Sequence, residues 1–559
     1  MPDTPEILHI SATNAVEPIS SNEKPSFKID QRVHIAGDPR RTGTVKYIGP
    51  VEGYSGIWVG VDWDNCDGKH DGSLNGIRYF MAHGEKSGSF VRPQNLSGGI
   101  SLLDALNFRY RGNSTKEEED EMYVLSARNN RVAIQLVGKD KLQEKLNRFE
   151  ELLGVSLSYL GISSTGSPQQ IKAAVPNLKL LDLTGNLLTE WKDVGAICEE
   201  LAALEVLNLS NNVMTHDITD LPLLKNIRIL VLNNCGMTWD QVEILKHSLP
   251  AVEELHLMEN NLRTIMPEPS AAGTYVEGFD LLRLLNLEDN CIDMWDEIVK
   301  FSQLRSLQQL HLNKNNLKHI FYPKCIPRCD SLTGNEMQGK GIKPFENLQC
   351  LLLGGNKIED LESVDSLNFF PSLKDVRLSD NPVADPGKGG IPRFVSIARL
   401  AKVQILNGSE VSLRERKESE IRYVRLVLSK LQSDNPEEIK RLHPRFTELK
   451  ELHGIEDEKP SAGKSGPQKM ASGLLSITLK CVGASIGEKP PIIKKLPAAT
   501  TVGKLKALCE SFFKLKSIKP KLFLQEEGSP LPLLLDDEMA SLTELGIGTG
   551  STILVDEES

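Results

Sequence analysis

The segments LKLLDLTGN (178–186) and LEVLNLSNN (204–212) share one pattern, in which leucines recur at fixed spacing and an asparagine closes the run. Six further segments repeat the pattern, namely IRILVLNNC (227–235), VEELHLMEN (252–260), LRLLNLEDN (282–290), LQQLHLNKN (307–315), LQCLLLGGN (348–356) and LKDVRLSDN (373–381). Their last residues are spaced 26, 23, 25, 30, 25, 41 and 25 residues apart. A pattern that returns at this interval indicates a repeat architecture, to which each copy adds one short strand.

The pattern is the signature of leucine-rich repeats, in which neighbouring copies bury the inward leucines of each strand. A degenerate copy at 153–160 fits an N-terminal cap, and the spacing of 41 marks an insertion around 321–345. The closing side chains can bond backbone groups of the following turn; they are Asn186, Asn212, Cys235, Asn260, Asn290, Asn315, Asn356 and Asn381. We expect a looser turn at Cys235, because a thiol is a weaker donor than an amide.

The leucines and asparagines of the pattern are therefore scaffold, and functional residues are expected at exposed positions of the strands. Examples of such positions are Asp182, Asn208, Val231, His256, Asn286, His311 and Arg377. The sequence does not rank these positions against one another.

The composition of the 559 residues excludes several other classes of protein. A formal net charge of −11 without a long basic block argues against nucleic-acid binding. An apolar run of about 18 residues is absent, so we expect no membrane span. Nine scattered cysteines indicate reduced thiols in a cytosolic protein. The pair Cys325 and Cys329 is either two free thiols in a loop or half of a zinc site, and we predict no metal.

Residues 27–98 are glycine-rich with alternating apolar residues, which predicts a small β-barrel. Four motifs resemble the CAP-Gly domain over nearly its whole length: GIWVGVDWD (56–64), GKHDGS (68–73), GIRYF (76–80) and SGSFVRP (87–93). The resemblance implies binding of acidic C-terminal tails that end in an aromatic residue, such as the tail of α-tubulin. The motif is usually GKNDG, so a histidine replaces an asparagine here.

The resemblance implies that this loop and a set of aromatic residues bind the tail. The predicted tail-binding residues are Trp63, Gly68, Lys69, His70, Asp71, Gly72, Tyr79, Phe80 and Phe90. Lys69 and His70 would contact the free carboxylate, and the aromatic side chains would form the groove. With histidine in place of asparagine, three outcomes are open: tail binding is retained, it is weakened, or it becomes sensitive to pH near 6.5. For Trp58 we favour a place in the core, and for Asp71 a role in the turn.

The remaining sequence divides into a lead-in, connecting segments and one further domain. We read 1–26 as disordered, 99–145 as a connecting segment, 146–405 as the repeats and 406–454 as their helical cap. A Pro-, Gly- and Ser-rich flexible linker follows at 455–473. Residues 474–559 resemble a ubiquitin-like (β-grasp) domain in the order of their expected elements. Two strands are followed by the amphipathic helical stretch TTVGKLKALCESFFKL (500–515), a strand, an acidic turn and a last strand.

The ubiquitin-like domain reads as a built-in docking module. The sequence ends in DEES, without a terminal Gly-Gly, so we expect no conjugation to other proteins. Nine lysines lie between Lys489 and Lys521. They form either a solvated face or a docking surface for an acidic partner.

A CAP-Gly domain, leucine-rich repeats and a ubiquitin-like domain, in this order, resemble the tubulin-folding cofactor E (tubulin-specific chaperone E) family. The resemblance implies a cytoplasmic chaperone of the cytoskeleton that binds the tail and body of α-tubulin. Its implied partners are other tubulin-folding cofactors, with β-tubulin in a larger complex, and proteasome or ubiquitin-pathway proteins through the last domain.

Two other functions fit the same modules: a CAP-Gly adaptor at microtubule tips and a ubiquitin-pathway shuttle. We predict no enzyme activity and no cofactor, because the sequence shows no nucleophile elbow, zinc-protease helix, phosphate loop or dinucleotide fingerprint. Neither a nucleic acid nor a membrane is expected as a partner.

Overall fold

The computed structural model describes residues 27–111, 123–125, 131–133, 149–215, 218, 223–265, 275–323, 343–431, 436–455, 474–483, 489–497, 499–515, 519–525, 532–542 and 545–557. The chain divides into two compact units, Met1–Ile292 with Gln303–Leu307, and Asp293–Ser302 with Gln308–Ser559. Our expectations for 1–26, for the cysteine pair at 325 and 329 and for nearly all of the linker 455–473 fall outside the described residues.

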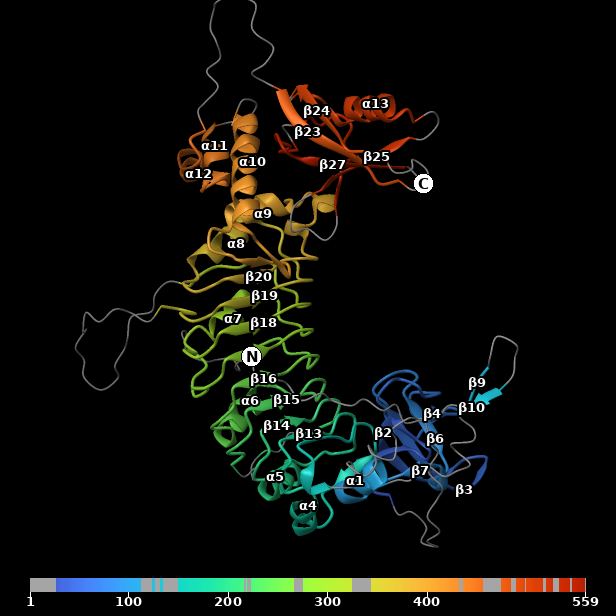
Figure 1. The fold of residues 1–559 in the computed structure, drawn as a ribbon. Helices are drawn as coiled ribbons and strands as arrows, with labels where there is room; N and C mark the ends of the chain where they lie inside the picture. The colour runs from blue at the N-terminus through green and yellow to red at the C-terminus, as the bar shows by residue number, and fades with distance from the viewer. Residues whose placement is uncertain are drawn as a thin grey trace, which may run out of the picture. The chain divides into compact units, whose positions relative to one another are not determined.

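The first unit begins with an antiparallel sheet of five strands in the order β6-β3-β2-β1-β7 (Figure 1). The strands are β1 (Arg32–Ile35), β2 (Asp38–Val51), β3 (Tyr54–Trp63), β6 (Gly88–Val91) and β7 (Leu96–Ser97). A short hairpin, β4 (Ser73–Leu74) with β5 (Ile77–Arg78), lies between β3 and β6 in the chain. Alternate residues of the sheet form its core, which contains Val33, Val45, Val59, Val61, Trp63 and Leu96.

The segment after this sheet is partly regular. Strand β8 (Ile100–Ser101) pairs in parallel with β12 (Ile162–Ser164), which precedes the first full repeat. Between them lie α1 (Leu102–Arg111) and a hairpin of β9 (Tyr123–Leu125) and β10 (Arg131–Ala133). The stretch that we read as a connecting segment therefore contains a helix and a strand pairing with the start of the repeats.

Parallel strands, one for each repeat, form the rest of the first unit. They are β11 (Gly154–Ser156), β13 (Leu180–Asp182), β14 (Val206–Asn208), β15 (Ile229–Val231), β16 (Glu254–His256) and β17 (Leu284–Asn286). The returning segments contain α4 (Pro168–Ala174), α5 (Trp191–Glu200) and α6 (Trp239–Leu245) (Figure 1). The central residue of each strand is at most 1% exposed, as the pattern predicts.

The ladder asparagines bond the turns of two successive repeats. The Nδ2 group of Asn186 donates to the carbonyl oxygens of Leu157 (3.0 Å) and Leu183 (2.8 Å), and its Oδ1 accepts from the Ile162 N–H (2.9 Å). At the variant position, the thiol of Cys235 contacts the carbonyl oxygens of Leu209 (3.2 Å) and Asn233 (3.5 Å). The thiol thus replaces the donor but offers no amide oxygen as an acceptor.

In the second unit the repeats continue with the parallel strands β18 (Gln309–His311), β19 (Cys350–Leu352) and β20 (Asp375–Arg377). Strand β21 (Ile405–Leu406) pairs with β20 and forms a hairpin with β22 (Ser409–Glu410). The helices of this part are α7 (Trp295–Val299), α8 (Leu361–Ser366) and α9 (Arg393–Arg399). The last strand thus ends in a hairpin rather than in another repeat.

A helical cap follows, with α10 (Leu413–Leu431), α11 (Pro436–Leu442) and α12 (Phe446–Leu452). Its apolar core includes Phe394 and Ala398 of α9 together with Tyr423, Val424 and Val427 of α10, so these residues cover the end of the repeats. Arg399 is 1% exposed and is paired with Asp365 (2.7 Å). This ion pair joins α9 to α8, and the Arg399 guanidinium also donates to the Leu442 carbonyl of α11 (2.8 Å), which links α9 to the cap.

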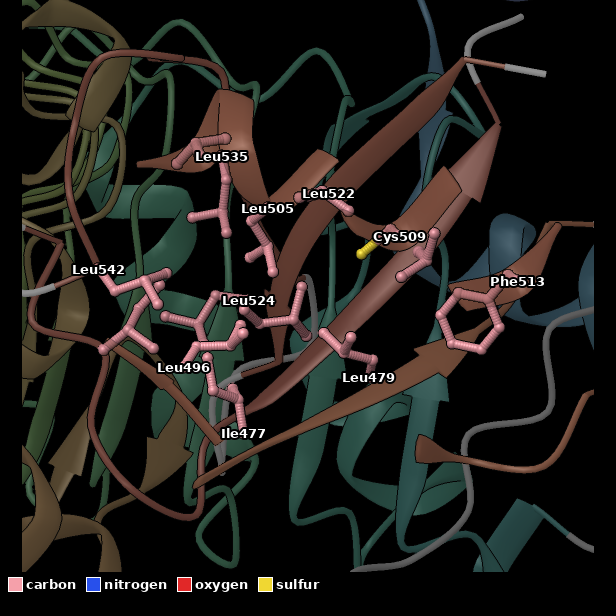
Figure 2. Packing of buried hydrophobic residues seen from close by; sticks show 14 of the residues in the cluster. Ile477, Leu479, Leu496, Leu505, Cys509, Phe513, Leu522, Leu524, Leu535 and Leu542 are labelled. Atoms are coloured by element: carbon pink, nitrogen blue, oxygen red, sulfur yellow. The ribbon is translucent and has the colours of Figure 1, made fainter. Parts of the chain in front are cut away.

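The last domain is a five-stranded sheet, ordered β24-β23-β27-β25-β26, with one helix packed against it. Its elements are β23 (Leu474–Cys481), β24 (Ile492–Pro497), α13 (Val502–Phe513), β25 (Pro520–Gln525), β26 (Leu533–Leu534) and β27 (Thr552–Glu557). Thr501 caps α13 by accepting from the Lys504 N–H. Leu505, Cys509 and Phe513 of the helix face the strand residues of the core (Figure 2). The multidomain fold class is confirmed.

Candidate tail-binding groove

The loop 68–72 is fixed by backbone bonds to the neighbouring strand β6. The N–H groups of Lys69 (2.7 Å) and His70 (3.1 Å) donate to the Gly88 carbonyl, and the Gly88 N–H donates to the His70 carbonyl (2.7 Å). A Cβ at Gly68 would lie 2.4 Å from the backbone carbon of Ser87. Gly72 has a φ of +96°, and a Cβ there would lie 2.1 Å from the Phe80 carbonyl oxygen. Both positions therefore require glycine.

An aromatic cluster lies beside this loop. The ring of Phe90 is at its centre, with centroids 4.9 Å from His70, 5.2 Å from Tyr79, 5.7 Å from Phe80 and 6.1 Å from Tyr47. Most of these pairs meet edge to face, the arrangement that aromatic rings prefer. The structure thus brings four predicted residues together.

Tyr47 is a member of the cluster that the sequence analysis missed. Its ring is 5.3 Å from that of Tyr79, and its hydroxyl donates to the Pro50 carbonyl (2.6 Å). The Tyr79 hydroxyl in turn accepts from the Glu52 N–H (2.9 Å). A tyrosine in the alternating strand β2 carries no signal of its own in the sequence, since it meets Phe90 only through the pairing of β2 with β3 and of β3 with β6, in which Tyr47 and Phe90 are both partners of Gly60.

The surroundings of His70 favour its neutral ring, and its Nε2 has no hydrogen-bond partner among the described residues. Its Nδ1 accepts from the Gly72 N–H (3.0 Å), so the proton of the neutral ring is assigned to Nε2. Burial lowers the pKa of His70 below its usual value, the Asp71 charge opposes this effect, and the Lys69 charge adds to it. Nε2–H can donate one hydrogen bond, which is the role that an asparagine amide would have at this position.

The two charged residues of the loop have different surroundings. Lys69 is exposed, and an ion pair for its ammonium group is not found among the described residues. Asp71 is paired with Arg78 (2.6 Å) and accepts from the Ser73 N–H (3.1 Å). The bonds from Arg78 and Ser73 lower the pKa of Asp71. Asp71 is thus engaged in the turn, while Lys69 is available to an anion.

The two tryptophans lie elsewhere than we expected. Trp63, which we placed in the groove, is 1% exposed in the core of the sheet, so its ring does not line the aromatic cluster. The last residue of β3 faces inward because side chains alternate along the strand. Trp58, which we placed in the core, is half-buried and lies under the Arg92 guanidinium at 3.8 Å.

The strand positions of the repeats also divide. Arg377 is exposed, and Asp182, Asn208, Val231, His256 and His311 are half-buried. Asn286 is 6% exposed, which corrects our expectation of an exposed side chain there.

A family profile for the CAP-Gly domain matches residues 29–96. Over the whole length, the chain is 62% identical to "Tubulin-folding cofactor E" of Arabidopsis thaliana, with 97% of this chain and 99% of the relative aligned. The chain belongs to the tubulin-folding cofactor E family. A more distant member, "Tubulin-specific chaperone E" of Danio rerio, is 30% identical over 92% of this chain and 96% of its own length.

Among solved structures, the C-terminal ubiquitin-like domain of mouse tubulin-specific chaperone e matches 17% of this chain and 96% of that domain, at 23% identity and a TM-score of 0.15. The described helices of this family member include none that is long and apolar enough to cross a membrane. Among all the residues that the structure describes, no group of three or more His, Cys, Asp or Glu side chains is placed to hold a metal ion.

Proposed function

We propose that this chain is a tubulin-folding cofactor, a cytoplasmic chaperone that binds α-tubulin and acts without catalysis of its own. In this proposal it works with other tubulin-folding cofactors to assemble and to take apart the αβ-tubulin heterodimer. Support comes from its family, whose members are named as tubulin-folding cofactors or tubulin-specific chaperones, and from identity along nearly the whole chain.

The observation that carries the proposal is the aromatic cluster beside the exposed Lys69 ammonium group and the His70 Nε2–H. A chain end that carries a carboxylate and an aromatic ring presents the complementary groups. Its ring would pack on Phe90 and Tyr79, and its carboxylate would accept from Lys69 and His70. The acidic residues before the chain end would add attraction to the same cation. These are the features of the C-terminal tail of α-tubulin.

The repeats supply a second surface, which we assign to the folded body of α-tubulin. Their strands align residue for residue, so that half-buried side chains form a row across neighbouring strands: Leu180, Val206, Ile229, Glu254 and Leu284. A mostly apolar row at partly exposed positions suits a protein partner. Capture of the tail would raise the effective concentration of the body at this row.

The ubiquitin-like domain is assigned to a third partner, either another cofactor or a protein of the ubiquitin pathway. Lys495, Lys504, Lys514, Lys519 and Lys521 of its basic segment are exposed, whereas Lys494 lies over the ring of Phe512 at 4.4 Å. Exposed lysines suit an acidic partner. Deletion of 474–559 should therefore leave α-tubulin binding largely intact, and loss of that binding would assign this domain to the tubulin site.

The test is a titration of soluble αβ-tubulin with the full-length protein, resolved by size exclusion, with intact α-tubulin and with α-tubulin that lacks its terminal tyrosine. We expect a complex that contains α-tubulin and that is weakened by loss of the tyrosine. The variant Lys69→Ala/His70→Ala should raise the Kd for a tail peptide about tenfold, or about 1.4 kcal/mol, without a lower melting temperature.

The control is Lys28→Ala, which removes an exposed lysine before β1 and should leave tail binding unchanged. Binding to microtubules alone, which remain intact, would replace the chaperone by an adaptor. Binding to proteasome subunits whether or not tubulin is present, with no α-tubulin complex, would indicate a shuttle. Unchanged tail affinity in the double variant would remove the groove from this site.

A further inference from the structure

A cysteine, a histidine and an aspartate form a hydrogen-bonded chain in the CAP-Gly domain, apart from the aromatic cluster. The Sγ atom of Cys66 lies 3.3 Å from Nε2 of His83, and Nδ1 of His83 lies 2.9 Å from Oδ1 of Asp62. Cys66 is in the loop after β3, Asp62 is near the end of β3, and His83 is in the loop before β6. The hydrogen bonds thus connect a nucleophile (Cys66) to a base (His83), and the base to a group that orients it (Asp62).

The aspartate fixes both the position and the tautomer of the histidine. Its Oδ2 accepts from the His83 backbone N–H (3.1 Å), while its Oδ1 accepts from Nδ1. Asp62 is 11% exposed at its side chain and His83 is 52% exposed, so the carboxylate is shielded while the ring borders solvent. With the proton on Nδ1, Nε2 presents a lone pair to the Cys66 thiol.

Cys66 also differs from four of the other cysteines that the structure describes. Burial raises the pKa of Cys198, Cys235, Cys350 and Cys509 to about 12, so these thiols remain protonated at neutral pH. Cys66 is exposed, and its backbone has a φ of 55°, a region that is uncommon for residues with a Cβ. It combines access from solvent with a base at hydrogen-bond distance, which are the two features of reactive cysteines.

We propose that Cys66 is a reactive thiol that is oxidised by hydroperoxides and then captured by a low-molecular-weight thiol, with His83 as its base and Asp62 as a positioning residue. The thiol proton moves to His83 Nε2, and the sulfur attacks the terminal oxygen of the peroxide. An S–O bond forms as the O–O bond breaks, and the leaving alkoxide, or hydroxide from hydrogen peroxide itself, takes the proton back from Nε2 to give an alcohol or water.

In this step the sulfur loses two electrons and becomes a sulfenic acid, and the peroxide is reduced. A second thiol then attacks the same sulfur. An S–S bond forms, the S–O bond breaks, and the departing oxygen leaves as water. The product is a mixed disulfide that a thiol reductant can reverse.

Modification of Cys66 is expected to weaken tail binding, an expectation that rests on the proposed function. Cys66 lies three residues before Lys69 in the same loop. A mixed disulfide with glutathione would bring two carboxylates to this loop, where they would compete with an acidic tail for the lysine. We expect the modified protein to bind the tail peptide about threefold more weakly.

The chemistry is tested first on the reduced full-length protein, without tubulin. A short pulse of iodoacetamide at pH 7.4 is followed by digestion and mass spectrometry of each cysteine peptide. An unassisted thiol is about 7% thiolate at this pH, so complete activation has a ceiling of about 14-fold. We expect Cys66 to react about fivefold faster than Cys291, which has no histidine at hydrogen-bond distance among the described residues.

Variants of His83 and Asp62 show whether the alkylation rate of Cys66 depends on its base or only on the exposure of its thiol. His83→Gln should slow alkylation at Cys66 about fivefold and leave Cys291 unchanged, and imidazole added to His83→Ala should restore part of the rate. Asp62→Asn should slow Cys66 as well, whereas Asp62→Glu should retain more of the rate because it keeps the carboxylate. Equal rates at Cys66 and Cys291, or an unchanged rate in a folded His83→Gln protein, would overturn the proposal.

The second arm uses hydrogen peroxide followed by glutathione. We expect a mixed disulfide at Cys66 in the wild type, little in His83→Gln and none in Cys66→Ser. Absence of the product from the wild type would overturn the oxidation step. Tail-peptide binding is then compared before and after modification, so that failure of the unmodified protein to bind counts against the proposed function, and unchanged binding after modification counts against regulation.

Discussion

The asparagine ladder of the repeats and the loop region 66–84 of the CAP-Gly domain both rely on side chains that bond backbone groups, yet they do so in different ways. In the ladder, asparagine recurs at all but one of the eight turns, and Asn186, Asn212 and Asn290 each donate to the carbonyl three residues earlier. In the loop region the spacings differ: His70 accepts from the N–H of Gly72, two residues on, whereas Asp62 near the end of β3 accepts from the N–H of His83, 21 residues on. A repeated contact can be recognised from its spacing, whereas a unique contact needs the fold.

The largest expected effect comes from removing one ladder amide. Asn290 donates to the carbonyl oxygens of Leu257 and Leu287 and accepts from the N–H groups of Asn260 and Leu262, at 2.9 to 3.0 Å. Asn290→Ala removes these four buried bonds, and we expect a loss of about 4 kcal/mol of stability, since each bond contributes about 1 kcal/mol. Denaturant unfolding of the full chain measures the loss.

The control for this change is Asn226→Ala, at an exposed side chain that makes one bond, to the Ala202 carbonyl (2.6 Å). It should cost about 1 kcal/mol or less. Equal losses in the two variants would mean that the ladder side chains contribute no more than a surface amide, and the comparison would fail.

Two glycines test the loop region in the same way. Gly72 and Gly76 both have positive φ values, +96° and +83°, but a Cβ at Gly72 would meet the Phe80 carbonyl, whereas one at Gly76 would meet nothing within 4 Å. Gly76→Ala should cost only the conformational term of about 1 kcal/mol. Gly72→Ala adds a steric clash and should cost about 3 kcal/mol in total. Thermal unfolding would show the difference, and similar melting temperatures would contradict the close approach.

Restoring the ladder at its variant position should have a smaller effect of opposite sign. In Cys235→Asn the new Oδ1 can accept from the Met214 N–H, by analogy with the bond from the Leu188 N–H to Asn212 (3.3 Å). We expect a gain of about 1 kcal/mol. A loss measured by denaturant unfolding would show that the local packing has adapted to the thiol.

The smallest effect concerns pH at the groove. Because the pKa of His70 in the folded protein lies below its usual value of 6.5, the neutral form of the ring predominates between pH 8 and 6.5. Tail-peptide affinity should change less than about threefold over this range. Below pH 6.5 the unfolded chain binds a proton that the folded ring resists, so the stability contributed by His70 decreases as pH falls.

The matching variant is His70→Asn, which removes the titrating ring. It should remove the contribution of this ring to the pH dependence of tail-peptide affinity and of stability. Binding is followed by fluorescence of a labelled peptide and stability by thermal unfolding. A wild-type affinity that rises steeply between pH 8 and 6.5 would show that the imidazolium binds the tail.

Part of the aromatic cluster and its loop was predictable from local sequence. The motif around Lys69 identified the loop, and resemblance added Tyr79, Phe80 and Phe90, which the structure groups with His70. Tyr47 was missed and Trp63 was wrongly included, since the direction of a strand side chain depends on the register of its sheet. The role of Asp71 in the turn was recognised because aspartate often bonds its own loop.

The sequence by itself determined the repeats, the order of the three modules and the family, because these depend on patterns that recur along the chain or extend over whole domains. Tertiary structure alone decided which aromatic rings meet at Phe90 and which ladder contacts Cys235 keeps. It also placed Cys66, His83 and Asp62 together. These contacts join residues from different strands and loops, and their distances are set by strand pairing and packing, which leave no periodic trace in the sequence.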